Sequence, residues 1–390
     1  MIETGFLNRR FRTTESFQLT EWNQLTDNDR TMLLTVADVG DIYGLFISLS
    51  PGSTTQIIAG RESALIFLHC KDYFHLPNFV LSQPYGKYEN LVAELVLNDI
   101  LALQYQETYI SGSKAAPLIF GSEWLERQSS PGKLSLLSAN AIRYCFHLKN
   151  ETVKSLGNKL YTFNVIPMDK SHEKYLSSVS AVSDFLFTHF PENNTLSDNW
   201  TLNRERRYWF SWSRNKSIPQ QKYGETVNTY KLYLSPMPEA TASLFNIAVP
   251  VLTRSGAGSF KIGQTMNGLL RPDKMVAYFE NRDDLLLAAN ELEALCANTP
   301  AHGVPFTTQF DKNGLISFGI DFQASRKQGY SWRTWITDML ASIILQAKME
   351  NLEIDLLLEY IKVRLFIANV DISNWSYIDN EGGPDLQEKF

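Results

Sequence analysis

Three short strand-like runs between Thr229 and Phe279 constrain the fold of this 390-residue chain more than any other feature. They read TYKLYL, SFKIG and MVAYF, and each is rich in β-branched or aromatic residues between turn residues, as half-buried strands are. The glycines of SGAGSFKIG permit a sharp entry into the second run. The segment therefore predicts three short strands that pair into a sheet.

Cationic side chains fall on or beside these strands. Lys231 and Tyr233 are two residues apart, so their side chains share one face of a strand. If the strands pair, these two residues converge with Lys261, Arg271 and Lys274 at one end of the sheet. Such a cluster suits a phosphate, because arginine offers a planar donor fork and lysine a point charge. The alternative is that these are ordinary solvated cations on strand edges.

The rest of the chain predicts an α+β protein of two domains. The length exceeds what one hydrophobic core usually organises, and the polar stretch FPENNTLSDNW is the best linker, with a boundary near Asn194. We expect a mixed α+β domain over residues 1–194. Over residues 195–390 we expect a mostly antiparallel sheet flanked by helices, which include one that begins near Asn281 with an aspartate-rich first turn.

Local patterns in the N-terminal half predict further elements. ENLVAELVLNDILALQ keeps helical spacing of apolar residues from Leu91 to Leu101, and residues 170–189 give a second amphipathic helix. The runs IRYCFHL and KLYTFNVIP predict a pair of strands joined by a polar turn. RERRYWFSWSR, a basic and aromatic run, is better explained as a strand than as a nucleic-acid site.

Composition excludes several classes of function. A net charge of −6 argues against a nucleic-acid partner, which needs a basic footprint. The three cysteines form no CxxC pair and the six histidines take no metal-ligand spacing, so we expect no metal. We expect no membrane partner and a cytoplasmic protein, because no apolar run is long enough to span a bilayer.

The order of motifs in the C-terminal half resembles the HopA family of type III effector-like proteins. The matching order is KLYLSP, SFKIG, RPDKMVAYF, GVPFTTQF and SFGIDF, followed by the tail LLLEYIKVRLFIANVDISNWSYIDN. That family includes the stand-alone lyase subunits of class V lanthipeptide and thioamitide biosynthesis. More distantly, the chain is similar to OspF-type phosphothreonine lyases.

This resemblance implies roles for individual residues. Lys231 takes the place of a phosphate-binding lysine, Lys261 that of the catalytic base, and Arg271 that of a phosphate-binding arginine. Tyr233 occupies the position of the general-acid histidine, either as a proton donor whose pKa Lys231 lowers or as a packing residue. Arg326 and Arg333 could reach the anion, and Arg326 is the candidate for a further phosphate-binding arginine.

The implied activity is a lyase that eliminates phosphate from phosphoserine or phosphothreonine in a ribosomal peptide, leaving dehydroalanine or dehydrobutyrine. No cofactor is implied, and the chain carries no kinase motif, so a separate kinase subunit is the expected partner. The N-terminal domain is the candidate for docking a partner or leader peptide. Two alternatives remain: an effector that acts on a protein, and a non-catalytic adaptor that binds a kinase subunit or leader peptide.

Overall fold

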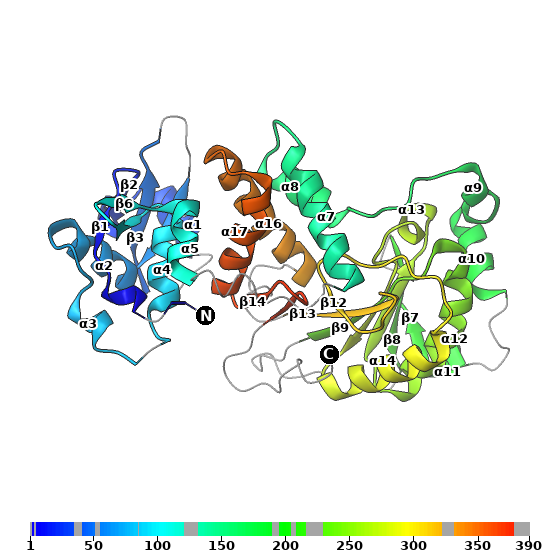
Figure 1. Ribbon diagram of the computed structural model, residues 1–390. Helices are drawn as coiled ribbons and strands as arrows, with labels where there is room; N and C mark the ends of the chain where they lie inside the picture. The colour runs from blue at the N-terminus through cyan, green and yellow to red at the C-terminus, as the bar shows by residue number, and fades with distance from the viewer. Residues whose placement is uncertain are drawn as a thin grey trace. The chain divides into compact units, whose positions relative to one another are not determined.

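The chain forms two compact units, which are described separately. The computed structural model describes residues 2–3, 5–34, 41–50, 55–84, 86–120, 132–188, 195–203, 208–215, 229–321 and 331–377. The first unit comprises Met1–Ser129 and Ala347–Val370, and the second comprises Ser130–Gln346 and Asp371–Phe390. Both units combine helices with antiparallel sheets, so the expected α+β class is confirmed (Figure 1).

This division differs from the one expected at Asn194, which itself lies outside the described residues. Residues 132–188 belong to the second unit, although the sequence placed them in the first domain. Conversely, α17 (Ile354–Ile367) returns to the first unit, where Tyr360 Oη donates to Leu97 O at 3.5 Å and Arg364 Nη1 donates to Asn98 Oδ1 at 2.6 Å. Such long-range contacts carry no local signal in the sequence.

The first unit contains two three-stranded antiparallel sheets, in the orders β1-β5-β6 and β2-β3-β4. The strands are β1 (Phe11–Thr13), β2 (Phe17–Glu21), β3 (Ile42–Ser48), β4 (Gln56–Gly60), β5 (Leu101–Tyr105) and β6 (Thr108–Ile110). The helices are α1 (Asp27–Leu34), α2 (Arg61–Asp72), α3 (Asn78–Leu81), α4 (Glu89–Leu97) and α5 (Ala116–Phe120). Helix α4 ends before the expected Leu101, because Asp99 takes a φ of 61° and the chain turns into β5.

The second unit is built on a seven-stranded sheet in the order β12-β13-β9-β11-β10-β8-β7. Its strands are β7 (Trp200–Leu202), β8 (Trp209–Arg214), β9 (Thr229–Leu234), β10 (Ser259–Gly263), β11 (Met275–Phe279), β12 (Thr308–Gln309) and β13 (Ile316–Asp321). A short pair, β14 (Val370–Asp371) and β15 (Ser376–Tyr377), follows. The three strands predicted between Thr229 and Phe279 are confirmed, and each is antiparallel to its neighbours.

The helices assigned wholly or mainly to this unit are α7 (Lys133–His147), α8 (Val153–Tyr161), α9 (Lys170–Leu176), α10 (Val179–Phe187), α11 (Thr195–Asn199), α12 (Thr241–Arg254), α13 (Met266–Leu269), α14 (Arg282–Cys296) and α16 (Trp332–Met349). The expected start of α14 is confirmed, since the Asp284 N–H donates to the Asn281 cap at 2.8 Å. The single helix expected over 170–189 is two, because Ser178 is extended and caps α10.

The strand pair expected from IRYCFHL and KLYTFNVIP is wrong. IRYCFH lies within α7, and α8 ends at Tyr161. The aromatic content suggested strands, but the buried residues of α7 recur with helical spacing at Leu134, Ser138, Ala141, Ile142 and Cys145. The Thr152 side chain then accepts the Ser155 N–H and starts α8.

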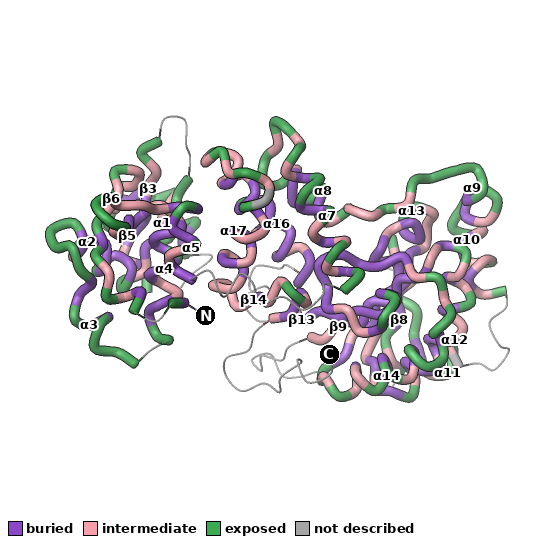
Figure 2. The backbone as a smooth tube through the Cα atoms, viewed as in Figure 1, coloured by how far each residue is buried: buried purple, intermediate pink, exposed green. Residues whose placement is uncertain are grey.

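One face of the large sheet packs on helices. Leu232 and Leu234 of β9, Ala277 of β11 and Phe260 of β10 are buried with the apolar sides of α12 and α14. Both helices lie on the same side of the strands in Figure 1, and β9 is largely buried in Figure 2. Because side chains alternate along a strand, the neighbours of these residues point to the opposite face.

Candidate anion-binding site

The strand register places three of the predicted site residues on the sheet face opposite the α12 and α14 core. Lys231 of β9 pairs with Tyr278 of β11, and Lys261 of β10 pairs with Val276 of β11. Directly paired residues in antiparallel strands point to the same face. Lys231, Tyr233 and Lys261 therefore share this face, as the spacing of the first two predicted.

Tyr278 and Trp209 lie between the cations of this face. The Lys231 Nζ is 5.6 Å from the centre of the Tyr278 ring, and the Lys261 Nζ is 5.8 Å from the same centre. The Lys261 Nζ also lies 4.3 Å from the centre of the Trp209 ring, and the Arg271 Cζ lies 5.4 Å from it. Aromatic rings attract cations at these distances.

The same alternation of cationic and aromatic side chains continues onto helices α8 and α16. The Arg271 Cζ is 5.5 Å from the centre of the Tyr161 ring, and the Arg333 Cζ is 4.4 Å from that centre. We call this arrangement the cation–aromatic row, and in order it contains Lys231, Tyr278, Lys261, Trp209, Arg271, Tyr161 and Arg333. The row brings together four of the cations named from the sequence, which are Lys231, Lys261, Arg271 and Arg333.

Asp273 fixes the direction of Arg271. Arg271 donates from Nε to Oδ1 and from Nη2 to Oδ2 of Asp273, both at 2.8 Å. The Arg333 Nη1 lies 3.0 Å from the same Oδ2. Burial opposes ionisation of Asp273, but the charges of Arg333 and Arg271 outweigh it and hold its pKa well below the ordinary value. The side chain of Arg271 is 31% exposed, and Asp273 does not use its Nη1 edge.

Arg333 is an interior residue, only 1% exposed. It lies in the first turn of α16, and its Nη2 donates to Tyr161 O at 2.8 Å while its Nε donates to Pro305 O at 3.3 Å. These bonds hold the Arg333 guanidinium beside Asp273. Arg333 therefore affects Arg271 through their shared partner, Asp273.

Asp321 holds Lys231. The Lys231 ammonium forms an ion pair with Asp321 Oδ2, and both side chains are largely buried. The other oxygen of Asp321, Oδ1, accepts the Trp332 N–H at 2.7 Å at the start of α16. A Cβ at Gly319 would come within 3.0 Å of the Trp332 ring, so the glycine lets this turn approach β13 beside Lys231.

Lys274 is fully buried. Its Nζ donates to Pro236 O at 2.6 Å and to His302 Nδ1 at 2.9 Å, and His302 Nε2 donates to Asn164 O at 2.5 Å. Burial lowers the pKa of Lys274 to about 7. Burial, with a smaller contribution from Lys274, lowers the pKa of His302 to about 3.

Tyr233 is also inside the protein. It is 3% exposed and packs with Val276 and Val304. The lowered phenol pKa expected from Lys231 is wrong, because burial raises the pKa of Tyr233 well above its ordinary value and the charge of Arg333 only partly offsets this. The packing alternative stated for Tyr233 matches this environment.

One predicted residue cannot be placed. Arg326 lies outside the described residues. Within the described part of the chain, no three His, Cys, Asp or Glu side chains are grouped to hold a metal ion. Over the same residues, no helix is both long enough and apolar enough to cross a membrane.

Sequence reasoning missed Trp209, Tyr161, Asp273 and Asp321 as parts of the site. Asp273 had a signal, because it lies two residues after Arg271 in the RPDK run. Trp209 was placed correctly on a strand, but its partners are distant in the sequence. Tyr161 was assigned to a strand that does not form.

Among known proteins, only solved structures are similar to this chain. No family model matches the chain, and no curated protein matches it. The chain is similar to an effector protein from Pseudomonas syringae pv. tomato strain DC3000, at 10% identity over 63% of this chain and 98% of the other, with a TM-score of 0.39. A second effector, from Pseudomonas syringae pv. syringae strain 61, gives 13% identity over 62% and 98%, with a TM-score of 0.35.

A third structure is the type III effector and phosphothreonine lyase OspF from Shigella flexneri. It shares 13% identity over 52% of this chain and 97% of the other, with a TM-score of 0.26. At identities and TM-scores this low, the likenesses carry no argument about activity. Membership of the HopA family therefore stays a prediction.

Proposed function

We propose that the second unit is a lyase that eliminates phosphate from phosphoserine or phosphothreonine in a peptide. The observation that carries the proposal is the position of Lys261 in the cation–aromatic row. The ring of Tyr278 connects it to Lys231, and the ring of Trp209 connects it to Arg271. Several cations stabilise a bound phosphate dianion, and elimination needs a base close to them, which a neutral lysine amine can be.

The reaction breaks two bonds on the substrate. A base takes the proton from Cα, and the electron pair of that C–H bond forms the Cα=Cβ double bond. The Cβ–O bond then breaks, and inorganic phosphate leaves with its electrons. The products are a dehydroalanine or dehydrobutyrine residue, phosphate, and the protonated base; an acid that protonates the leaving oxygen is left as its conjugate base.

Lys261 is the proposed base. An amine accepts a proton only in its neutral form, so Lys261 must lose its own proton before it can take one from the substrate. Lys231 and Arg271 lie on either side of Lys261 along the row and are the proposed phosphate-binding cations. Asp273 holds the Arg271 guanidinium in one orientation, so that little freedom is lost when its Nη1 edge meets phosphate oxygens.

The leaving oxygen needs a proton or close cations. Tyr233 was the sequence candidate for the donor, but it is buried with Val276 and Val304 and keeps its proton strongly. Tyr278 is partly exposed, and its ring lies between Lys231 and Lys261. We therefore assign proton donation to Tyr278 and packing to Tyr233.

Lys274 and Arg326 have different proposed roles. Lys274, with its ammonium hydrogen-bonded to Pro236 and His302, is proposed to position the chain that carries Asp273 instead of binding phosphate directly. Arg326 stays a predicted phosphate ligand. The proposed substrate is phosphorylated, so a separate kinase must supply it, and a ribosomal peptide of the lanthipeptide or thioamitide type is the expected precursor.

The second candidate function is phosphopeptide binding without catalysis, as an adaptor. One observation favours it: the residue in the position of the general acid is a buried tyrosine. Thiol trapping distinguishes the two functions. If the full chain is incubated with a phosphothreonine peptide and a small thiol, a lyase yields a thioether adduct of the new alkene. An adaptor protects the phosphopeptide and yields no adduct.

A further inference from the structure

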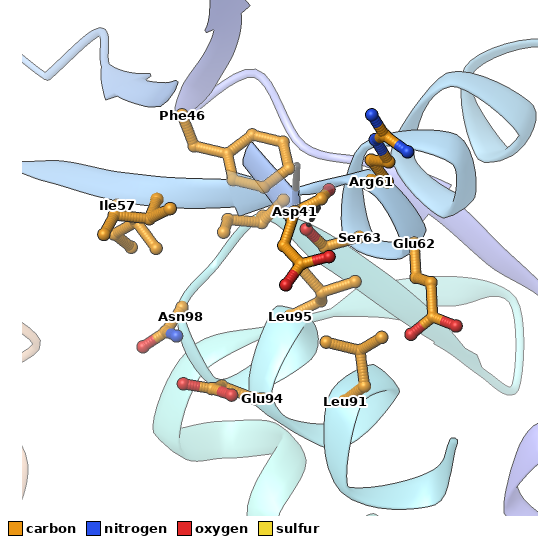
Figure 3. A pocket seen from close by; sticks show the side chains of 13 residues that line it. Asp41, Phe46, Ile57, Arg61, Glu62, Ser63, Leu91, Glu94, Leu95 and Asn98 are labelled. Atoms are coloured by element: carbon orange, nitrogen blue, oxygen red, sulfur yellow. Dashed lines mark hydrogen bonds between the residues drawn. The ribbon is translucent and has the colours of Figure 1, made fainter. Parts of the chain in front are cut away.

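The first unit contains a cavity of about 470 Å³ that the proposed reaction does not use. It lies between strand β4, the first turn of α2 and one side of α4 (Figure 3). Its buried apolar lining includes Phe46, Leu95 and Ile100. Apolar walls with a few polar groups are typical of ligand sites.

The cavity runs along the edge of a sheet. Strand β4 is the last strand of the order β2-β3-β4. Ile57 and Ile58 are consecutive on β4 and both line the cavity. Consecutive strand residues point to opposite faces, so a cavity that both residues line reaches the strand edge. An extended peptide can pair with the backbone groups of such an edge.

The rim of the cavity is acidic. The exposed carboxylates of Asp41, Glu62 and Glu94 line it, against the one exposed guanidinium of Arg61. Figure 3 shows Glu94 and Glu62 on either side of the apolar Leu91. Glu62 is held in place, because it accepts the Tyr88 hydroxyl at 2.7 Å. A lysine or arginine side chain of a ligand would complement the negative charge of this rim.

We propose that this cavity binds an extended peptide segment in which apolar residues alternate with a lysine or arginine. The peptide backbone pairs with β4, an apolar side chain contacts Phe46 and Leu95, and the basic side chain lies among the carboxylates. The proposal is independent of the phosphate chemistry, and it gives the docking role expected for the N-terminal half a specific place.

A displayed library of random short peptides, selected against the full chain, tests the proposal. The expected result is enrichment of peptides that carry a basic residue beside alternating apolar residues. Ile58→Lys places a charge on the strand edge and should weaken the enriched peptides about tenfold or more. The control is Leu65→Lys, because Leu65 is a similarly exposed apolar residue on α2 that does not line the cavity.

The charge of the rim is tested separately. Glu94→Arg should weaken the same peptides by about tenfold or more, whereas Glu107→Arg, at an exposed turn outside the cavity, should not. Enrichment of acidic peptides, no enrichment at all, or equal binding by Ile58→Lys and wild type would overturn the proposal. Self-association of the chain that Ile58→Lys abolishes would also overturn it, because the occupant would then be a second copy.

Discussion

The ammonium of Lys261 lies 4.3 Å from the centre of the Trp209 ring, and the two residues come from the neighbouring strands β10 and β8. The Arg271 guanidinium lies against the same ring at 5.4 Å. A contact of this kind is worth about 0.5–2 kcal/mol, depending on how far the cation is desolvated. Trp209 therefore holds two cations near one point on the sheet face.

The orientation of Arg271 should matter for turnover. Arg271→Lys keeps the charge but loses the planar fork that pairs with Asp273, so we expect kcat/KM for a phosphothreonine peptide to fall by about 10- to 100-fold. Arg254→Lys is the matched control, because Arg254 makes a similar forked pair with Glu291 on exposed helix surfaces. Equal kinetics for wild type and Arg271→Lys would remove Arg271 from the phosphate site.

Tyr278 and Tyr233 lie on one sheet face, and we assign proton donation to the first and packing to the second. Tyr278→Phe should lower kcat by about 10²- to 10⁴-fold with little change in KM, because it removes the hydroxyl of the proposed donor. Tyr233→Phe should leave kcat nearly unchanged, since Tyr233 is buried with Val276 and Val304. Steady-state kinetics of both variants decide the matter, and the reverse pattern would return the acid role to Tyr233.

The sequence predicted the sheet better than it predicted the site. Strands β9, β10 and β11 are rich in β-branched or aromatic residues between turn residues, which predicted the strands, and the two-residue spacing of Lys231 and Tyr233 predicted their shared face. The burial and contacts of the site residues did not follow from the spacing. The burial of Lys274 depends on His302 and Pro236, which lie 28 and 38 residues away.

The contacts within the cation–aromatic row could not be predicted from the sequence either, because they join residues that are distant in the chain. Tyr161 and Arg333 meet Arg271 and Asp273 only when helices α8 and α16 are packed. The pattern of α7 was ambiguous, because a run such as IRYCFHL fits both periods over a short window. Distant pairing and helix packing, which no single window contains, determine these contacts.

Asp321 should compete with phosphate for Lys231. Asp321→Asn keeps an oxygen that can accept the Trp332 N–H but removes the charge opposite Lys231. We expect the free energy of unfolding to fall by about 3–5 kcal/mol, because a buried ion pair loses one partner. We expect tighter binding of inorganic phosphate by the folded protein, measured by calorimetry.

The control for this variant is Asp311→Asn. Asp311 accepts the Ile316 and Asn313 N–H groups but forms no ion pair among the described residues. It should lose stability without a gain in phosphate affinity. A loss of phosphate affinity in Asp321→Asn would contradict direct competition.

The buried pair of Lys274 and His302 should make stability depend on pH. The folded-state pKa of Lys274, about 7, is below the value of about 10.4 for an unfolded lysine, so the unfolded chain binds the extra proton between these values. The free energy of unfolding should therefore rise by roughly 2 kcal/mol from pH 7 to pH 9. His302 gives the same sign between about pH 3 and pH 6.5.

Urea unfolding of Lys274→Met across this range provides the check. The variant should lose the rise from neutral to alkaline pH, while Lys312→Met, at an exposed turn position, should keep it. A wild-type stability that is flat from pH 7 to pH 9 would show that Lys274 is not held in a neutral form by its surroundings.

The most direct measurement is the mass of a phosphothreonine peptide after incubation with the wild-type chain and with Lys261→Ala. For the wild type we predict loss of phosphoric acid, which leaves dehydrobutyrine; hydrolysis would instead leave threonine, heavier by one water. For Lys261→Ala we predict a rate lower by about 10²- to 10⁴-fold, with peptide affinity nearly intact because Lys231 and Arg271 remain. An unchanged peptide, a hydrolysed one, or wild-type turnover by Lys261→Ala would contradict the proposed lyase.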